Sequence, residues 1–392
     1  MKNSFIAFTA RALRPFAALF YACIKLLRPQ QHKATFISRQ SDLTPVDFQL
    51  LARELTAQDR SLKIKILCCS DATRGSRFLG NLRQTMLELW HIASSQVVVL
   101  DGYALSISYF TQRKSLYVLQ MWHALGAIKR FSWQAIDTPG GRNAKIARAL
   151  RMHANYTALL VGGVASVEVF RHAFRTPRSR IHVLPLPRTD VLRTPDLNRI
   201  DLLMSSHKEF FAHGPVILYA PTFRDDDESY AQWMRALRQL AQAVEDIDAT
   251  LIVKTHLREH EESAQDKAYF AESDHVIFNP EVDTLDLLAI VDHVITDYSG
   301  VSFEAAVAGK PLWFYIPDYA DYRAKRGLNF DLRDYLPDAC FDDPVELLER
   351  ARTTSLPTPQ QEQFLQDFVA LSPRPELTSS KQIARLILKG IQ

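Results

Sequence analysis

Residues 294–315 of the chain read VITDYSGVSFEAAVAGKPLWFY. This stretch predicts a buried strand, a polar turn, an amphipathic helix and a second buried strand. Asp297, Tyr298 and Ser299 fall where the first strand ends and the helix begins. In an open parallel sheet, ligands bind at the carboxyl ends of the strands, and a helix N-terminus there favours phosphate. A purely local role stays open, in which Ser299 caps the helix and Asp297 shapes the turn.

Composition narrows the class of protein. A chain of 392 residues with 47% hydrophobic residues is long enough for two domains with full cores. The formal charge of +3 is too small to indicate nucleic-acid binding by itself. The four cysteines show no metal-ligand or paired spacing, which favours a reducing cytosol. Neither a GxGxxG nor a Walker A motif occurs, so dinucleotide oxidoreductases and P-loop enzymes are poor candidates.

The amino terminus combines apolar and basic residues. Residues 2–28 interleave phenylalanines and leucines with Lys2, Arg11, Arg14, Lys25 and Arg28. The longest uncharged run, Pro15 to Ile24, is about half of the roughly 20 residues that a membrane-spanning helix needs. The pattern predicts an amphipathic helix lying on an anionic membrane surface. The alternative is a helix that packs on the protein's own surface.

After Pro29, short apolar runs alternate with helical patterns. Runs of this kind, buried on both faces, are typical of parallel sheets covered by helices. Strands are expected at 34–38, 62–69, 96–100, 115–121, 157–161, 180–184, 216–219, 250–254, 275–278, 294–296 and 312–315. Helices are expected at 46–57, 75–95, 164–174, 230–244, 284–290, 299–307 and 379–389.

The predicted domains follow from this alternation. The proline-containing stretch from Pro185 to Lys208 is interpreted as the connection between two domains. The expected division is a membrane-associated segment (1–30), two Rossmann-like domains (31–195 and 205–375) and a final crossing helix (376–392). The fold class is therefore α/β, with two parallel-sheet domains facing a cleft.

Polar clusters follow several of the predicted strands. They are Trp122–Arg130 with its histidine, Tyr219–Arg224, Ile252–Leu257, the Asp297–Ser302 turn, and Tyr322–Asp331 with three cations. Histidine can act as a general base near neutral pH, and arginine suits phosphate. Read singly, each cluster has an ordinary explanation: a packed histidine, a surface ion pair beside Asp225–Asp227, or a solvated basic loop. Together they indicate a site for a polyanion.

From about Lys33 to Leu332 the chain resembles the CDP-glycerol glycerophosphotransferases of teichoic acid and capsule synthesis. The resemblance rests on the order and spacing of short motifs. These are Trp122–Arg130, Pro187–Asp190, Tyr219–Arg224, Lys254–His256, Thr296–Ser299, Lys310–Tyr315 and Tyr322–Asp331. It implies a GT-B fold, with a membrane-linked acceptor at the first domain and a CDP-alcohol donor at the second.

The resemblance also implies roles for individual residues. His123 resembles the base that removes a proton from an acceptor hydroxyl, which then attacks the β-phosphorus and releases CMP. By the same resemblance, His256 is expected to act as a general acid that protonates the leaving group. The implied donor and phosphate contacts are Thr222, Arg224, Lys254, Asp297, Ser299, Ser302 and Arg326. Lys129 and Arg130 are expected on the acceptor or membrane side. No cofactor and no catalytic metal are expected, because the cations can neutralise the developing charge.

Three positions depart from the family pattern: Ala124 replaces a glycine, Leu257 a proline and Gly300 a second serine. None removes an ionisable group, but they leave open which polyol phosphate is transferred. The implied partners are a nucleotide-activated polyol, a lipid-linked polymer or glycan acceptor and an anionic membrane surface, without nucleic acid. The implied location is peripheral, on the cytoplasmic face of the cell membrane. A GT-B glycosyltransferase using a nucleotide sugar and a catalytically silent membrane-surface protein remain alternatives.

Overall fold

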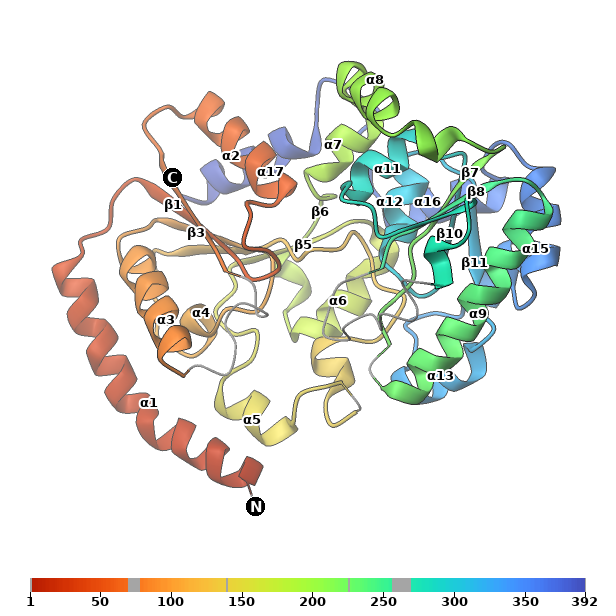
Figure 1. Ribbon diagram of the computed structural model, residues 1–392. Helices are drawn as coiled ribbons and strands as arrows, with labels where there is room; N and C mark the ends of the chain where they lie inside the picture. The colour runs from red at the N-terminus through yellow and green to blue at the C-terminus, as the bar shows by residue number, and fades with distance from the viewer. Residues whose placement is uncertain (1, 70–77, 139, 225, 256–268, 392) are drawn as a thin grey trace. The chain divides into compact units, whose positions relative to one another are not determined.

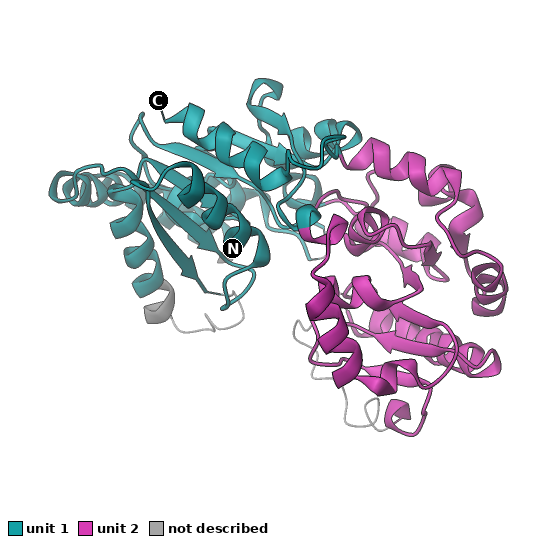
Figure 2. Ribbon diagram, turned by 90° about the horizontal axis from the view of Figure 1, so that it is seen from above, with its two compact units in different colours: residues 1–124, 131–190, 370–392 teal, residues 125–130, 191–369 magenta. Residues whose placement is uncertain are grey.

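The computed structural model describes residues 2–69, 78–138, 140–224, 226–255 and 269–391. The chain forms two compact units, coloured separately in Figure 2. Unit 1 comprises Met1–Ala124, Phe131–Asp190 and Ala370–Gln392. Unit 2 comprises Leu125–Arg130 and Val191–Val369.

Unit 1 is built on a parallel sheet whose strands run in the order β2-β1-β3-β4-β5-β6. Short runs such as Val97–Leu100 form strands because β-branched and aliphatic side chains fill both faces of a buried sheet. The strands are β1 (Lys33–Ser38), β2 (Lys63–Cys68), β3 (Val97–Leu100), β4 (Tyr117–Gln120), β5 (Ala158–Val161) and β6 (Ile181–Val183).

Helices cover both faces of this sheet. In Figure 1, α2 and α17 lie side by side on one face, and α3 lies on the other. The longer helices are α1 (Lys2–Leu27), α2 (Val46–Gln58), α3 (Phe78–Ala93), α6 (Val167–Phe174) and α17 (Ser379–Gly390). The shorter ones are α4 (Leu105–Ser108), α5 (Ala144–Ala149), α7 (Arg188–Arg193, which ends in unit 2), η1 (Ser132–Ala135), η2 (Val164–Ser166) and η3 (Arg178–Arg180).

Unit 2 repeats the plan with strands in the order β12-β11-β10-β7-β8-β9, all parallel. Trp313 and Phe314 of β11 and Leu218 of β7 are fully buried, so this sheet is also covered on both faces. The strands are β7 (Val216–Tyr219), β8 (Thr250–Val253), β9 (Val276–Phe278), β10 (His293–Thr296), β11 (Leu312–Tyr315) and β12 (Cys340–Phe341).

The helices of unit 2 also form two layers. Figure 1 shows α11, α12 and α16 on one side of the sheet and α9 and α15 on the other. The longer helices are α8 (Leu197–Ser206), α9 (Asp227–Asp246), α13 (Tyr319–Arg326), α15 (Pro344–Arg352) and α16 (Pro359–Phe368). The shorter ones are α11 (Thr284–Ile290), α12 (Val301–Val307), α14 (Leu332–Tyr335), η4 (Lys208–Phe211) and η5 (Pro337–Ala339).

The predicted α/β class with two Rossmann-like parallel sheets is confirmed. The stretch 185–208, interpreted as a connection, contains α7 and α8, and the boundary between the units falls within it, at Asp190 and Val191. The basic stretch 322–331, for which a solvated loop was the alternative, begins inside α13. The strand β12 is not among the strands expected from the sequence, and it is two residues long.

Residues 125–130 belong to unit 2 although the flanking chain belongs to unit 1. Lys129 forms an antiparallel bridge with Leu328, and the Arg130 N–H donates to the Gly327 carbonyl over 3.0 Å. A Cβ atom added to Gly126 would lie 2.6 Å from the Phe303 ring, so this position needs glycine for close approach. The segment is therefore an inserted piece of unit 2.

Candidate active site

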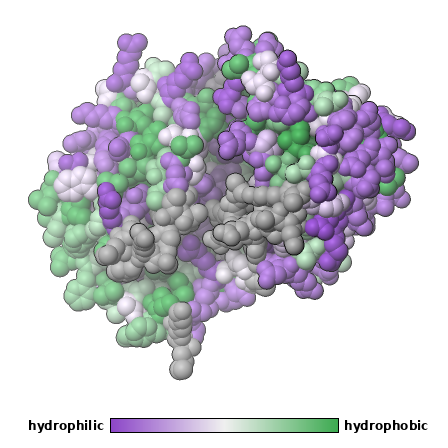
Figure 3. Space-filling model, in the orientation of Figure 1, coloured by the Kyte–Doolittle hydropathy of each residue, from purple (hydrophilic) through white to green (hydrophobic). Residues whose placement is uncertain are grey.

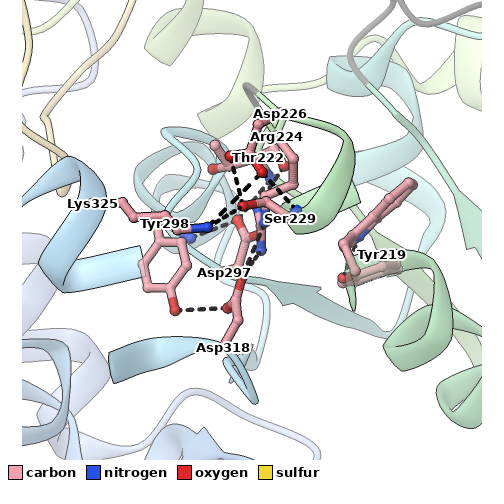
Figure 4. A network of polar contacts seen from close by, with 10 residues as sticks. Tyr219, Thr222, Arg224, Asp226, Ser229, Asp297, Tyr298, Asp318 and Lys325 are labelled. Carbon is pink, nitrogen blue, oxygen red and sulfur yellow. Dashed lines mark hydrogen bonds and ion pairs between the residues drawn. The ribbon is translucent and has the colours of Figure 1, made fainter. Parts of the chain in front are cut away.

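A network of charged side chains lies at the carboxyl edge of the unit 2 sheet. Arg224 follows β7, Asp297 follows β10 and Asp318 follows β11. These strands are neighbours in the order β11-β10-β7, and the carboxyl ends of parallel strands share one edge. The fold thus brings together three residues that are far apart in sequence (Figure 4).

The Arg224 guanidinium bridges the two carboxylates. Its Nη1 lies 2.8 Å from Asp297 Oδ2, and its Nη2 lies 2.8 Å from Asp318 Oδ2. The side chains of Arg224 and Asp297 are 4% and 0% exposed. Burial alone would lower the pKa of Arg224, but Asp297 and Asp318 outweigh it and hold the pKa above its ordinary value.

Asp297 also fixes the turn that follows β10. Its Oδ1 accepts the N–H of Thr222 at 2.7 Å and that of Tyr298 at 2.5 Å. The Tyr298 hydroxyl donates to Asp318 Oδ1 at 3.0 Å, and its ring stacks on Tyr322 with centroids 3.8 Å apart. Burial, with Asp318 and Asp297 nearby, raises the pKa of Tyr298 far above its ordinary value.

This arrangement changes the interpretation of Arg224 and Asp297. One guanidinium and two carboxylates carry a net negative formal charge, and the guanidinium is enclosed by its partners. The phosphate contacts of Arg224 and Asp297 stay predictions, and the observed ion pairs show that both charges already have partners inside the protein. The alternative of a surface pair of Arg224 with Asp225–Asp227 does not fit its burial, since its described partners are Asp297 and Asp318. Asp225 lies outside the described residues.

The predicted hydroxyl contacts differ in accessibility. Ser299 is half-buried, and its Oγ lies 3.5 Å from the Val301 N–H. Ser302 is fully buried and donates its hydroxyl to the Ser299 carbonyl, so it holds the first turn of α12. The Thr222 hydroxyl is buried and has no hydrogen-bond partner among the residues that the structure describes. Ser299 and Thr222 remain the candidates for donor contact.

Lys254 lies at the same edge, directly after β8. Its Nζ donates to the Pro280 carbonyl over 2.6 Å, and burial lowers its pKa. The adjacent Thr255 exchanges hydrogen bonds with Asn279, its N–H donating over 2.8 Å and its Oγ1 lying 2.6 Å from the Asn279 Nδ2. These bonds set the direction in which Lys254 leaves the sheet. His256, the expected acid, lies outside the described residues.

Three further cations lie in the segment 125–130 and in α13. Arg326 is half-buried at the end of α13, Lys129 is half-buried and Arg130 is exposed. The sequence pattern predicts Lys129 and Arg130 in the first domain, whereas both belong to unit 2. The difference arises because the backbone of 125–130 pairs with residues 327–329.

In unit 1, His123 follows β4 at the carboxyl edge of the other sheet. Its Nδ1 lies 2.9 Å from the carbonyl oxygen of Asp101, which follows β3. A carbonyl can only accept, so Nδ1 carries the proton and Nε2 holds the lone pair of the neutral ring. The Trp122 ring lies 4.2 Å from the imidazole between centroids, and Trp122 itself has a positive φ of 63°. The imidazole is therefore held in one orientation and one tautomer.

Asp101 is a candidate positioning residue that sequence reasoning missed. Its buried carboxylate accepts the Ser38 hydroxyl at 2.5 Å and the Arg39 N–H at 3.1 Å. Burial raises the pKa of Asp101 to about 6, although those two hydrogen bonds oppose the shift. The signal was present in the sequence, because Asp101 directly follows the apolar run Val97–Leu100. Its backbone orients His123, so we regard it as a positioning residue.

The motif Pro187–Asp190 holds unit 1 together. Arg188 Nη2 lies 2.5 Å from Asp47 in the first turn of α2. Asp190 accepts the N–H groups of Ser379 and Ser380 at 2.7 and 3.0 Å, at the start of α17. This marker of the sequence family therefore joins α2, α7 and α17.

Two Rossmann-like units with polar side chains at the carboxyl edges of their sheets define the GT-B class of transferase folds. Comparison with known proteins specifies the group. A sequence model described as CDP-glycerol:poly(glycerophosphate) glycerophosphotransferase matches residues 19–389, and the chain belongs to that family.

Individual relatives agree with this assignment. The chain is 29% identical over 350 residues to the teichoic acid ribitol-phosphate primase of Bacillus spizizenii, covering 87% of each chain. It is 30% identical over 297 residues to the teichoic acid glycerol-phosphate primase of Bacillus subtilis, covering 72% of this chain and 74% of that one. The fold is similar to that of the wall teichoic acid polymerase TagF, with a TM-score of 0.72 at 19% identity, covering 100% of this chain and 98% of that one.

Proposed function

We propose that the protein transfers a glycerol-phosphate or related polyol-phosphate unit from a CDP-alcohol to a hydroxyl of a membrane-linked acceptor in teichoic acid synthesis. The acceptor oxygen forms a bond to the β-phosphorus, and the bond from that phosphorus to the bridging oxygen breaks. CMP leaves with the bridging oxygen. The family and its primase and polymerase relatives support this reaction.

The observation that carries the proposal is the 2.9 Å contact between His123 Nδ1 and the Asp101 carbonyl oxygen. The Asp101 carbonyl holds the proton on Nδ1, which leaves Nε2 to take the proton of the acceptor hydroxyl. His123 also stands two residues before Leu125, where the segment that packs within unit 2 begins.

In this proposal the donor phosphates are held by unit 2. Lys254, Ser299 and Thr222 follow β8, β10 and β7, which are adjacent strands. Lys254 supplies positive charge, while Ser299 and Thr222 supply hydroxyl donors. Arg326, Lys129 and Arg130 supply further positive charge from the neighbouring backbone pair, and His256 would act as the acid toward the leaving group. Asp297, Arg224 and Ser302 support the loops that carry these residues.

A donor screen tests the reaction. The purified protein is incubated with CDP-glycerol, CDP-ribitol and UDP-sugars together with a lipid-linked acceptor, and released CMP, UMP and UDP are measured. Release of CMP with either CDP-alcohol supports the proposal. Release of UDP alone would instead establish the glycosyltransferase alternative.

Replacing His123 with alanine separates an enzyme from a silent binding protein. We expect His123→Ala to lose at least about 100-fold in turnover, in line with the loss of a general base, while it still binds CDP-alcohol. His172→Ala is the matched control, because His172 is exposed on α6 and at 59% side-chain exposure has no buried contact to lose. Equal turnover in both variants would exclude His123 as the base.

We further propose that α1 places the protein on an anionic membrane surface, at the cytoplasmic face. Phe5, Phe8, Phe16 and Leu19 are between 67% and 72% exposed, and Leu26 is 84% exposed. Their spacings of three, eight, three and seven residues place them on one side of a helix. Figure 3 shows apolar surface gathered where Figure 1 places α1. None of the helices in the described part of the chain is long and apolar enough to cross a membrane.

The other side of α1 packs on unit 1. Tyr21 is buried and donates to Gln112, and Lys25 Nζ donates to the Thr111 carbonyl at 2.8 Å. Deleting residues 1–28 would therefore remove packing as well as membrane contact. Phe8→Glu with Phe16→Glu is the sharper test, since both side chains are exposed. We expect this variant to cosediment less with anionic vesicles while it keeps activity on a soluble acceptor. Undiminished cosedimentation would contradict the proposal.

A further inference from the structure

We propose that unit 2 contains a second site, a binding site for a divalent transition-metal ion of the zinc type, formed by His213, Asp248 and His275. One ligand atom from each of the three residues lies within 4.8 Å of the other two. Two imidazoles and a carboxylate are the donor set that zinc accepts, with water completing four-coordination. The reaction proposed above needs no part of this site.

The unit 2 sheet fixes the spacing of the three residues. His213 precedes β7, Asp248 precedes β8 and His275 precedes β9, and these strands are adjacent in the order β7-β8-β9. The three residues therefore lie at the amino edge of the sheet. The donor-contact candidates Thr222 and Lys254 lie beyond the carboxyl ends of β7 and β8, about 13 Å away for strands of this length.

Backbone contacts hold the three segments in place. The Gly214 N–H donates to the Asp248 carbonyl at 2.8 Å, and the Leu251 N–H donates to the His275 carbonyl at 2.7 Å. A Cβ atom on Gly214 would lie 2.7 Å from the Asp248 carbonyl oxygen, so only glycine allows this approach. Asp248 itself has a left-handed φ of 52°, and its Oδ1 lies 3.0 Å from His213 Nδ1. The backbone positions of the three residues are thus set before a metal arrives.

The hydrogen bonds of His275 prepare it as a ligand. Its Nδ1 lies 2.8 Å from the Ala249 carbonyl, which can only accept, so Nδ1 carries the proton. Nε2 is left with the lone pair. Metal-binding histidines commonly donate their other ring N–H to a backbone carbonyl in this way, which fixes both the tautomer and the ring orientation.

His213 and Asp248 complete the set. His213 Nδ1 lies 3.0 Å from Asp248 Oδ1, and the His213 and His275 rings stack with centroids 3.7 Å apart. A tetrahedral zinc ion with bonds near 2.0 Å places its ligand atoms about 3.3 Å apart. Rotation of the side chains can bring the ligand atoms from within 4.8 Å of one another to this spacing, because Asp248 is 78% exposed and His213 is 24% exposed.

A metal at this position would join three loops at the amino edge and so stabilise unit 2 without touching the substrate. Zinc binding to the folded state alone raises the unfolding temperature according to its concentration relative to Kd. The experiment measures zinc binding and thermal unfolding of the metal-free full chain, by equilibrium dialysis and by a titration with Zn²⁺ alone. We expect one tightly bound ion and a higher unfolding temperature.

The matched pair of variants removes the same number of histidines from different places. His213→Ala with His275→Ala should weaken zinc binding at least about 100-fold, the loss expected when ligands themselves are removed, and abolish the thermal shift. His172→Ala with His207→Ala should preserve both. Co²⁺ replacing Zn²⁺ gives the visible absorption of a tetrahedral ion if all three residues bind it. Equal zinc binding and equal thermal shifts in both double variants would overturn the proposal, as would wild-type protein that binds no ion.

Discussion

Replacing Arg224 with methionine tests whether the buried charge network of unit 2 is structural. Methionine keeps an unbranched side chain and removes the guanidinium that bridges Asp297 and Asp318. The two carboxylates, 0% and 8% exposed, are then left without their cation. Breaking a buried ion pair from one side costs about 3–5 kcal/mol, because a charge stays buried and uncompensated.

The expected loss can be measured against a surface pair in the same unit. Arg323 is 58% exposed and lies 2.7 Å from Asp331, so Arg323→Met should cost at most about 1 kcal/mol. For a domain of 150–250 residues, about 2–4 °C is lost per kcal/mol. Arg224→Met should therefore lower the unfolding temperature of unit 2 by roughly 6–20 °C, from the same principles. Hydrogen exchange of peptides covering β7 and β10 assigns the loss to unit 2.

A second substitution sharpens the result. Adding Asp297→Asn to Arg224→Met removes one of the stranded charges, so the double variant should regain part of the lost stability. The reasoning is refuted if Arg224→Met unfolds within about 1 kcal/mol of Arg323→Met, the limit set for an exposed pair. If Arg224→Met is stable but binds CDP-alcohol weakly, the predicted phosphate contact of Arg224 is supported instead.

Three further predictions concern single positions. Burial holds the pKa of Asp101 near 6, above the unfolded value of 3.8. The protonated side chain therefore favours the folded state, and this contribution to the free energy of unfolding is complete below pH 4 and is lost as pH rises through 6. Between pH 4 and pH 7 the free energy of unfolding should fall by up to roughly 3 kcal/mol less in Asp101→Asn than in the original protein. Thr222→Val removes a buried hydroxyl without a described partner, so stability should change by less than about 1 kcal/mol while the KM for the donor rises. An unchanged KM would exclude donor contact. Asp190→Ala removes the acceptor for two N–H groups of α17 and should cost about 2 kcal/mol in urea unfolding, whereas a cost below about 0.5 kcal/mol would contradict the bracing role.

The sheets could be predicted because their strands are short, apolar and buried on both faces. Val97–Leu100, Val216–Tyr219 and Leu312–Tyr315 have this character, and each forms a strand. The helix α13 could not be predicted in the same way. Its sequence YADYRAKR has no apolar stripe, and none of its residues is buried, so the periodicity that identifies a helix is absent.

The residues at the sheet edges could be predicted, but their partners could not. Once the ends of β7 and β10 are known, Arg224 and Asp297 must lie near the same edge. The pairing of Arg224 with Asp297 depends on the strand order β11-β10-β7, which places β7 beside β10, a strand that follows it much later in the chain. The packing of 125–130 within unit 2 is equally non-local, since it depends on backbone bonds to residues 327–329.

Burial separates the candidate residues into two groups with different consequences. Asp297, Arg224 and Ser302 are enclosed and satisfied by neighbouring protein groups, so their substitution should first alter stability. Lys254 and Ser299 are only half-buried, as is His123 in unit 1, and their substitution should first alter binding or turnover. Residues of the two groups lie close together in the same loops. An enclosed residue fixes the loop, and a neighbouring half-buried residue presents its side chain. A charged residue at a strand end is therefore weak evidence for substrate contact until its enclosed partners are known.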